Sequence, residues 1–227
     1  MGLNVAVVVP EGIVLSSDSL AFLRQDDEGF VATSTRTFAI WDKFLVSFVG
    51  NGFINGKPYG YYIQDIEYTR HSDQIASAKE VAHFINTYFQ KSQNESDDPL
   101  TVYVAGSTID DAGPHHELYL IDRGKITNLN QTNGKNDVYN YHVIGRSLWI
   151  NKLVLPTQFI DEHTNMQESF NAATIDFSKY SLDDAEKFAQ FLISTTVEMD
   201  NFIQTRASAN LDITSGVVTM YGAKIKL

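Results

Sequence analysis

The sequence contains no cysteine, so it can form neither a disulfide framework nor a thiolate metal site. It also lacks any uninterrupted apolar stretch near the roughly 20 residues that a transmembrane helix needs, so we expect no membrane as a partner. Basic residues are scarce: 17 lysines and arginines stand against 28 aspartates and glutamates, which gives a formal net charge of −11. This balance argues against binding to nucleic acid or to an anionic membrane.

Signals for export and for cofactor binding are missing from the sequence as well. The first residues lack the basic and apolar regions of a signal peptide, which predicts a cytoplasmic protein. The six histidines are scattered except for His115 and His116, which are neighbours. Adjacent residues of an extended segment point to opposite faces, which is a poor spacing for metal ligands. We therefore predict no metal and no cofactor, and we interpret the histidines as solvated or packed side chains.

The length and the apolar content are those of one folded unit. A chain of 227 residues, 43% of them hydrophobic, can bury a substantial core. No internal repeat, low-complexity run or linker divides the sequence. We predict a single domain that covers residues 1–227.

Local patterns predict both strands and helices. The apolar runs 3–9 and 13–19 are joined by Pro10-Glu11-Gly12, which predicts a hairpin. Apolar residues recur at three- and four-residue spacing over 77–93, which predicts a core-facing helix. Another helix is predicted to begin near Ser181, whose side chain can cap it. The other predicted elements are a polar loop at 24–29, strands at 33–40, 44–49, 100–106, 117–122 and 217–221, and a helix at 61–71.

Two of these segments carry a resemblance to a known family. One is the opening strand, a charged residue with glycine, a second apolar strand and then Asp18-Ser19. The other is Val104-Ala105-Gly106, followed by Leu118-Tyr119 and Ile121-Asp122. Both resemble proteasome β-type subunits, which belong to the N-terminal-nucleophile (Ntn) hydrolases. The resemblance implies an α+β fold, specifically a four-layer αββα sandwich in which two antiparallel sheets lie between helix layers.

The resemblance also implies where the catalytic residues would lie. The catalytic threonine of the family falls on Gly2, its aspartate on Asp18 and its lysine on Arg36. In the family the threonine hydroxyl attacks the scissile carbonyl and the threonine's own α-amine helps to accept the proton. Glycine carries no hydroxyl, and a guanidinium stays protonated and cannot act as a base. Arg36 can still pair with Asp18, and a structural ion pair is the simpler interpretation.

Three further positions match the supporting parts of that site. Gly50 falls on the residue whose backbone N–H donates to the oxyanion in the family. Asp212 and Ser215 match the aspartate and serine that support the amine of the nucleophile. Ser16 shares the face of Asp18 on the second strand and is the one nearby serine that could replace the nucleophile, but nothing in the sequence supplies it with a base.

The sequence leaves open whether the chain is an enzyme, because the family is a threonine-type peptidase and hydrolase while the nucleophile is missing here. The favoured hypothesis is a non-proteolytic proteasome-β-like protein, a pseudoenzyme that acts as an assembly or binding subunit. One alternative is an active Ntn-type peptidase or amidohydrolase that cleaves amide bonds through an unrecognised nucleophile. Another is a stand-alone domain that binds a small ligand or a partner in the old cleft. The family further implies a homo-oligomer, with a ring as one form, and a peptide or protein substrate if the chain is active.

Overall fold

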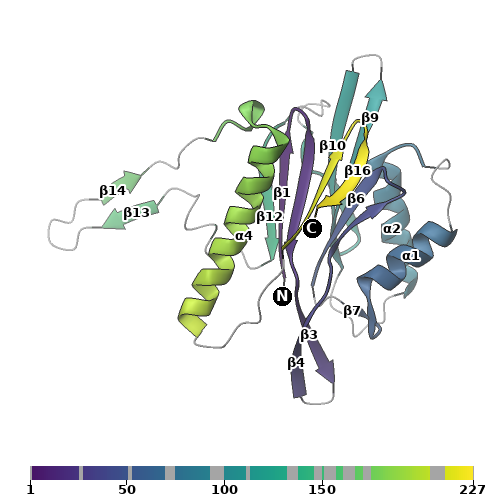
Figure 1. The fold of residues 1–227 in the computed structure, drawn as a ribbon, viewed down its shortest axis with the longest axis horizontal. Helices are drawn as coiled ribbons and strands as arrows, with labels where there is room; N and C mark the ends of the chain where they lie inside the picture. Colours follow the sequence, from purple (N-terminus) through teal and green to yellow (C-terminus); the bar gives the residue numbers. More distant parts are fainter. Residues whose placement is uncertain are drawn as a thin grey trace.

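The computed structural model is a mixed α+β fold in which the strands pair antiparallel (Figure 1). It describes residues 2–25, 28–50, 53–69, 75–92, 100–110, 113–131, 138–145, 150, 157–160, 167–170, 175–204 and 213–226.

The first sheet is built around the N-terminal hairpin. Strands β1 (Leu3–Val9) and β2 (Gly12–Asp18) pair antiparallel, as the sequence predicts, and every residue of both strands is buried. Because both faces of β1 are covered, it reads as a nearly continuous apolar run rather than as an alternating pattern. The strand order in this sheet is β12 (Tyr141–Gly145), β1, β2, β15 (Ile213–Thr219) and β16 (Gly222–Lys226).

The second sheet contains a long central hairpin. Its strands β9 (Thr101–Asp110) and β10 (Gly113–Asp122) pair over their whole length, so both are longer than predicted. The additional residues are largely polar and extend past the apolar core, so they carry no hydrophobic pattern. The strand order is β11 (Lys125–Asn128), β10, β9, β6 (Phe44–Val49) and β5 (Thr37–Ile40).

Two-stranded ribbons are added to these sheets. Strand β3 (Leu20–Gln25) pairs with β4 (Glu28–Thr33), so the loop predicted at 24–29 is too long: residues 24–25 and 28–29 belong to strands. The prediction of a loop rested on the polar run Arg24-Gln25-Asp26-Asp27-Glu28-Gly29, whose outer residues belong to the two paired strands. The other ribbons join β7 (Phe53–Ile54) to β8 (Lys57–Pro58) and β13 (Thr157–Ile160) to β14 (Gln167–Phe170). In Figure 1, β3–β4 and β13–β14 project away from the two sheets.

The helices lie close to their predicted positions. Helix α4 (Leu182–Gln204) begins at the predicted cap: the Ser181 hydroxyl accepts a hydrogen bond from the Asp184 N–H at 3.2 Å, and the Asp184 carboxylate accepts one from the Ser181 N–H at 3.2 Å. The other helices are α1 (Tyr59–Thr69), α2 (Ala78–Ser92) and the short 3₁₀ helix η2 (Phe177–Lys179). Within the described part of the chain, no helix is both long enough and apolar enough to cross a membrane.

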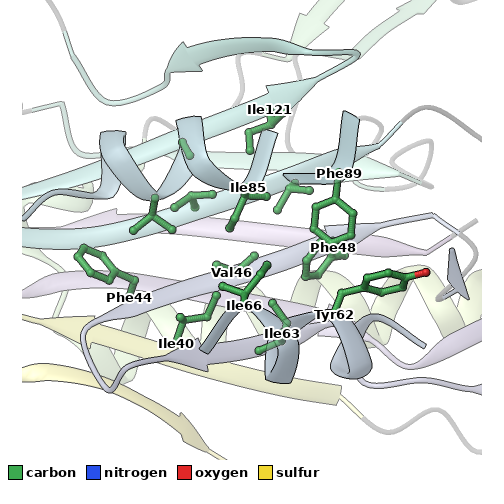
Figure 2. Packing of buried hydrophobic residues seen from close by; sticks show 14 of the residues in the cluster. Ile40, Phe44, Val46, Phe48, Tyr62, Ile63, Ile66, Ile85, Phe89 and Ile121 are labelled. Atoms are coloured by element: carbon green, nitrogen blue, oxygen red, sulfur yellow. The ribbon is translucent and has the colours of Figure 1, made fainter. Parts of the chain in front are cut away.

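The two five-stranded sheets pack face to face, and helices cover their outer faces. Leu15 of the first sheet and Leu45 of the second belong to one buried cluster that lies between the sheets. Helix α4 packs on the outer face of the first sheet, where Leu192 joins a cluster with Val5. Helices α1 and α2 pack on the outer face of the second sheet, and Figure 2 shows the apolar residues that join them. Those labelled are Ile40, Phe44, Val46, Phe48, Tyr62, Ile63, Ile66, Ile85, Phe89 and Ile121.

Two histidines in the sheets predict a dependence of stability on pH. Burial lowers the pKa of His116 on β10 and of His142 on β12 from the ordinary value of 6.5. The unfolded chain therefore binds these protons at a higher pH than the native chain does. The contribution of the two neutral histidines to the free energy of unfolding is fully present above pH 6.5. It decreases as the pH falls below 6.5, by at most about 1.4 kcal/mol per pH unit for each histidine.

Urea unfolding between pH 7.5 and 5 measures this effect. We expect the slope to weaken when His116 and His142 are both replaced by glutamine. His83→Gln, which changes an exposed histidine of α2, should keep the wild-type slope. An unchanged slope in the double variant would show that neither buried histidine is linked to folding.

Candidate functional site

Three of the predicted site residues lie at the same end of the two sheets. Gly2 precedes β1, Asp18 ends β2 and Arg36 precedes β5. The antiparallel pairing of β1 with β2 brings Gly2 to the end at which Asp18 lies, since Asn4 is opposite Ser17. The Phe48 N–H donates to the Arg36 carbonyl at 3.0 Å, which attaches Arg36 to β6. All three site residues are buried, and the exposed fraction of Arg36 is 0%.

Arg36 and Asp18 form a buried ion pair. The Nε atom of Arg36 lies 3.8 Å from Oδ1 of Asp18, and the same oxygen accepts a hydrogen bond from the Leu3 N–H at 3.1 Å. Burial lowers the pKa of Arg36 from its usual value, while the Asp18 carboxylate acts in the opposite direction. An arginine starts from so high a pKa that it stays protonated, so it neutralises Asp18 and cannot accept a proton in catalysis. This is the structural ion pair that the sequence analysis favours.

The guanidinium of Arg36 occupies the space in which a side chain of residue 2 would lie. A Cβ atom built on Gly2 would be 1.5 Å from Nη1, 2.3 Å from Cζ and 2.9 Å from Nη2 of Arg36. Real Cβ atoms essentially never come within 3.0 Å of a heavy atom outside their own residue and its two chain neighbours. The glycine at position 2 is therefore matched to the arginine at position 36. Threonine cannot occupy position 2 unless Arg36 moves.

Gly50 follows β6 at the same end of the second sheet. Its φ of +133° is a conformation that other residues rarely adopt, and a Cβ atom there would be 2.9 Å from the Tyr59 hydroxyl. Tyr59 in turn donates to the Val49 carbonyl at 3.4 Å and stacks on Phe48 at 4.5 Å between ring centroids. A glycine is thus required at position 50 for the backbone conformation and for the packing of Tyr59.

Ser215 lies on β15 directly opposite Ser16 of β2. The two hydroxyls are 2.9 Å apart, and Gln190 of α4 donates to the Ser215 hydroxyl at 3.5 Å. The hydrogen bonds described for Ser215 therefore lead to Ser16 and α4, not to Gly2. Asp212, its predicted companion, lies outside the described residues. Ser16, the other candidate nucleophile, is hydrogen-bonded to the Ser215 hydroxyl, and a hydroxyl cannot serve as its base.

A buried hydroxyl network, which the sequence analysis did not identify, lies beside the ion pair. The hydroxyl of Thr37 is hydrogen-bonded to the hydroxyl of Ser17 at 2.8 Å and to that of Ser47 at 2.8 Å. Asn4 donates to the Ser47 hydroxyl at 2.7 Å and to the Phe48 carbonyl at 3.0 Å. The network connects the first sheet to the second immediately next to Asp18 and Arg36. A polar Asn4 within an apolar run was the one signal for it in the sequence.

Replacing the central hydroxyl of this network should destabilise the fold. Thr37 is 1% exposed, and valine has nearly the same shape but no hydroxyl. Thr37→Val would leave the Ser17 hydroxyl without its described partner, at a cost of about 1–3 kcal/mol in unfolding free energy. Urea unfolding of this variant beside Thr127→Val, at an exposed position of β11, measures the effect. Equal stability of the two variants would mean that the network contributes nothing.

Neither a candidate metal site in the described part of the chain nor a match to a known protein identifies the role of this site, so its geometry has to be interpreted directly. Among the described residues, no three histidine, aspartate or glutamate side chains are grouped so that they could hold a metal ion. No protein-family model matches the chain, and no curated protein matches it.

Proposed function

We propose that this chain is a proteasome-β-like protein that does not cleave peptides and acts as an assembly or binding subunit. One observation carries the proposal: the Arg36 guanidinium lies where a side chain at position 2 would be, 1.5 Å from an ideal Cβ atom. Where the family has the side chain of its nucleophile, this chain therefore has the guanidinium of Arg36, which carries no hydroxyl. The place of its lysine holds a group that cannot lose its proton near neutral pH.

The arrangement of layers supports the proposed fold. Two antiparallel sheets pack on each other, with α4 outside one and with α1 and α2 outside the other. This order of helix, sheet, sheet and helix is compatible with the four-layer sandwich that the resemblance implies for an Ntn-hydrolase fold. Asp18, Arg36 and Gly50 lie at one end of the sheets, and this grouping supports the proposal that they correspond to one site.

The buried ion pair supports a structural use of this site. Removing two charges from water is costly, and the pair offsets that cost only while both partners are present. An enzyme that keeps a nucleophile needs open space beside it for the substrate carbonyl. Here the Arg36 guanidinium fills the space of the side chain at position 2, where that nucleophile would lie. The proposed subunit keeps the fold and closes its old catalytic centre with Arg36.

Peptide cleavage and assembly test this proposal together. A broad peptide mixture, read by mass spectrometry, should remain intact with the wild-type protein and with Asp18→Asn alike. Native mass spectrometry should find an assembly of several 25.4 kDa chains, because the proposed role is that of a subunit in a homo-oligomer or ring. Cleavage by the wild type that Asp18→Asn abolishes would contradict the non-proteolytic role. A monomer at all concentrations would contradict the subunit role.

A further inference from the structure

A pocket of about 580 Å³ lies at the end of the sheets opposite Gly2. Strand β15 passes Asp18 at Ile213 and reaches this other end at Thr219. The pocket is lined by the β5–β6 turn, the β15–β16 turn, the end of β9 and residues 75–76. Its volume is within the range of about 300–1,000 Å³ that is typical of small-molecule sites. The candidate site around Arg36 makes no use of this pocket.

Ser107, which lines the pocket, is hydrogen-bonded to a buried histidine. Ser107 of β9 lies directly opposite His116 of β10, and its hydroxyl oxygen is 2.7 Å from Nδ1 of the imidazole. The other ring nitrogen, Nε2, is 3.1 Å from the carbonyl oxygen of Pro10 in the β1–β2 turn. A carbonyl can only accept, so Nε2 carries the proton and donates. In the neutral ring Nδ1 is then the acceptor, and the Ser107 hydroxyl donates to it.

These contacts have the geometry of a nucleophile, a base and a group that orients the base. The hydroxyl donates directly to the nitrogen that would take its proton, and the Pro10 carbonyl fixes the tautomer of the ring. His116 is 6% exposed, so it is shielded from water, while Ser107 is half-buried at the pocket wall. Burial also lowers the pKa of His116, which keeps the imidazole neutral and able to accept a proton at pH 7.

We propose that Ser107 and His116 form the nucleophile and the general base of a second, hydrolytic site that acts on carboxylic esters. The Ser107 oxygen would bond to the ester carbonyl carbon while its proton passes to Nδ1 of His116. Collapse of the tetrahedral intermediate breaks the ester C–O bond, and the alcohol leaves with that proton. Water then attacks the acyl carbon and gives a proton to Nδ1. The bond to Ser107 breaks, the proton returns to its oxygen, and a carboxylic acid is released.

The lining of the pocket indicates the class of ester. Met220 and Tyr221, in the β15–β16 turn, are 41% and 90% exposed, and Ile109 at the end of β9 is 63% exposed. Apolar side chains exposed together around a pocket favour an apolar group in the ligand. Asp42 and Lys43 of the β5–β6 turn also line the pocket, so its wall carries one charge of each sign beside these apolar groups. An ester with a short apolar acyl chain fits this chemistry.

Hydrolysis of p-nitrophenyl butyrate and labelling by a fluorophosphonate test this inference on the full-length protein. The wild type should hydrolyse the ester and carry the phosphonate on Ser107, located by peptide mass spectrometry. Ser107→Ala should lose the label, and His116→Gln, whose amide can still bond Pro10 and Ser107, should lower the rate about 100-fold or more. Thr127→Val on β11 is the matched control and should keep the full rate.

The result that overturns the proposal is a wild-type rate no higher than that of Ser107→Ala, or a label on another residue. Thermal melts of each variant separate a loss of chemistry from a loss of fold, and Ser107→Ala removes only one oxygen. The test is independent of the proposed subunit role. Native mass spectrometry should find the same assembly for Ser107→Ala and for the wild type, so a failure at Ser107 does not affect the interpretation of the Arg36 site.

Discussion

Arg36→Met is expected to lower the free energy of unfolding by about 3–5 kcal/mol, because it removes the cation from a buried ion pair and leaves the carboxylate in place. Methionine keeps most of the apolar stem of arginine but does not fill the space of the buried guanidinium, so lost packing adds to the lost charge. Asp18 would still accept the Leu3 N–H, but it would no longer face the Arg36 guanidinium at 3.8 Å. Urea unfolding at pH 7 measures the loss.

A second substitution separates the charge effect from the effect of packing. Asp18→Asn in the Arg36→Met background removes the remaining charge while its amide oxygen can still accept the Leu3 N–H. The double variant should therefore be more stable than Arg36→Met alone, because replacing both members of a buried pair is far less costly than removing one. If Asp18→Asn makes the Arg36→Met protein still less stable, the ion pair is not the source of the effect.

Gly2→Ala is expected to lower the free energy of unfolding by about 1–3 kcal/mol through overpacking, because the new methyl group would meet the Arg36 guanidinium at 1.5 Å. The backbone at Gly2 is not left-handed, so conformation alone would permit alanine. Gly60→Ala in α1 is a matched control, since its Cβ atom would make ordinary contacts of 3.4 Å and 3.8 Å with Phe38. That variant should be neutral or slightly stabilising. Equal effects at Gly2 and Gly60 would contradict the packing described at Arg36.

Gly2→Thr would bring a side chain at position 2 into the same steric conflict with Arg36, and this conflict concerns activity. A threonine at position 2 has to displace Arg36 before its hydroxyl can point into the site. We therefore expect that this one substitution does not create a working nucleophile at position 2. The sequence alone could not reveal this conflict, because it shows only that glycine and arginine stand where the resemblance would place a threonine and a lysine.

Elements with a dense apolar pattern were predictable from the sequence. The N-terminal hairpin, α2 and the start of α4 have continuous or periodic apolar residues, or a cap such as Ser181, and the structure has all of them. The ribbon β3–β4 was missed because the polar run at 24–29 was interpreted as a loop, although residues 24–25 and 28–29 continue the strand pairing. The polar ends of β9 and β10 were missed for the same reason.

The site was predictable only in part, because its contacts join residues far apart in the chain. The Asp18–Arg36 pair was expected through the resemblance to the proteasome family. The fit between Arg36 and Gly2 depends on how the two sheets pack, which no local pattern records. The pairing of Ser107 with His116 depends on the register of the β9–β10 hairpin. In the sequence, His116 is one of two adjacent histidines, and nothing there indicates that Ser107 is its partner.

A double-mutant cycle between positions 2 and 36 tests the central claim most directly. Gly2→Ala should cost about 1–3 kcal/mol in the wild type. It should cost nothing, or stabilise by about 0.4–1 kcal/mol, in the Arg36→Met background, where the atoms it would meet are gone. The account predicts this change of sign in the free energy of unfolding. Additive effects of the two substitutions would contradict it, because they would show that the Arg36 guanidinium does not occupy the side-chain space of residue 2.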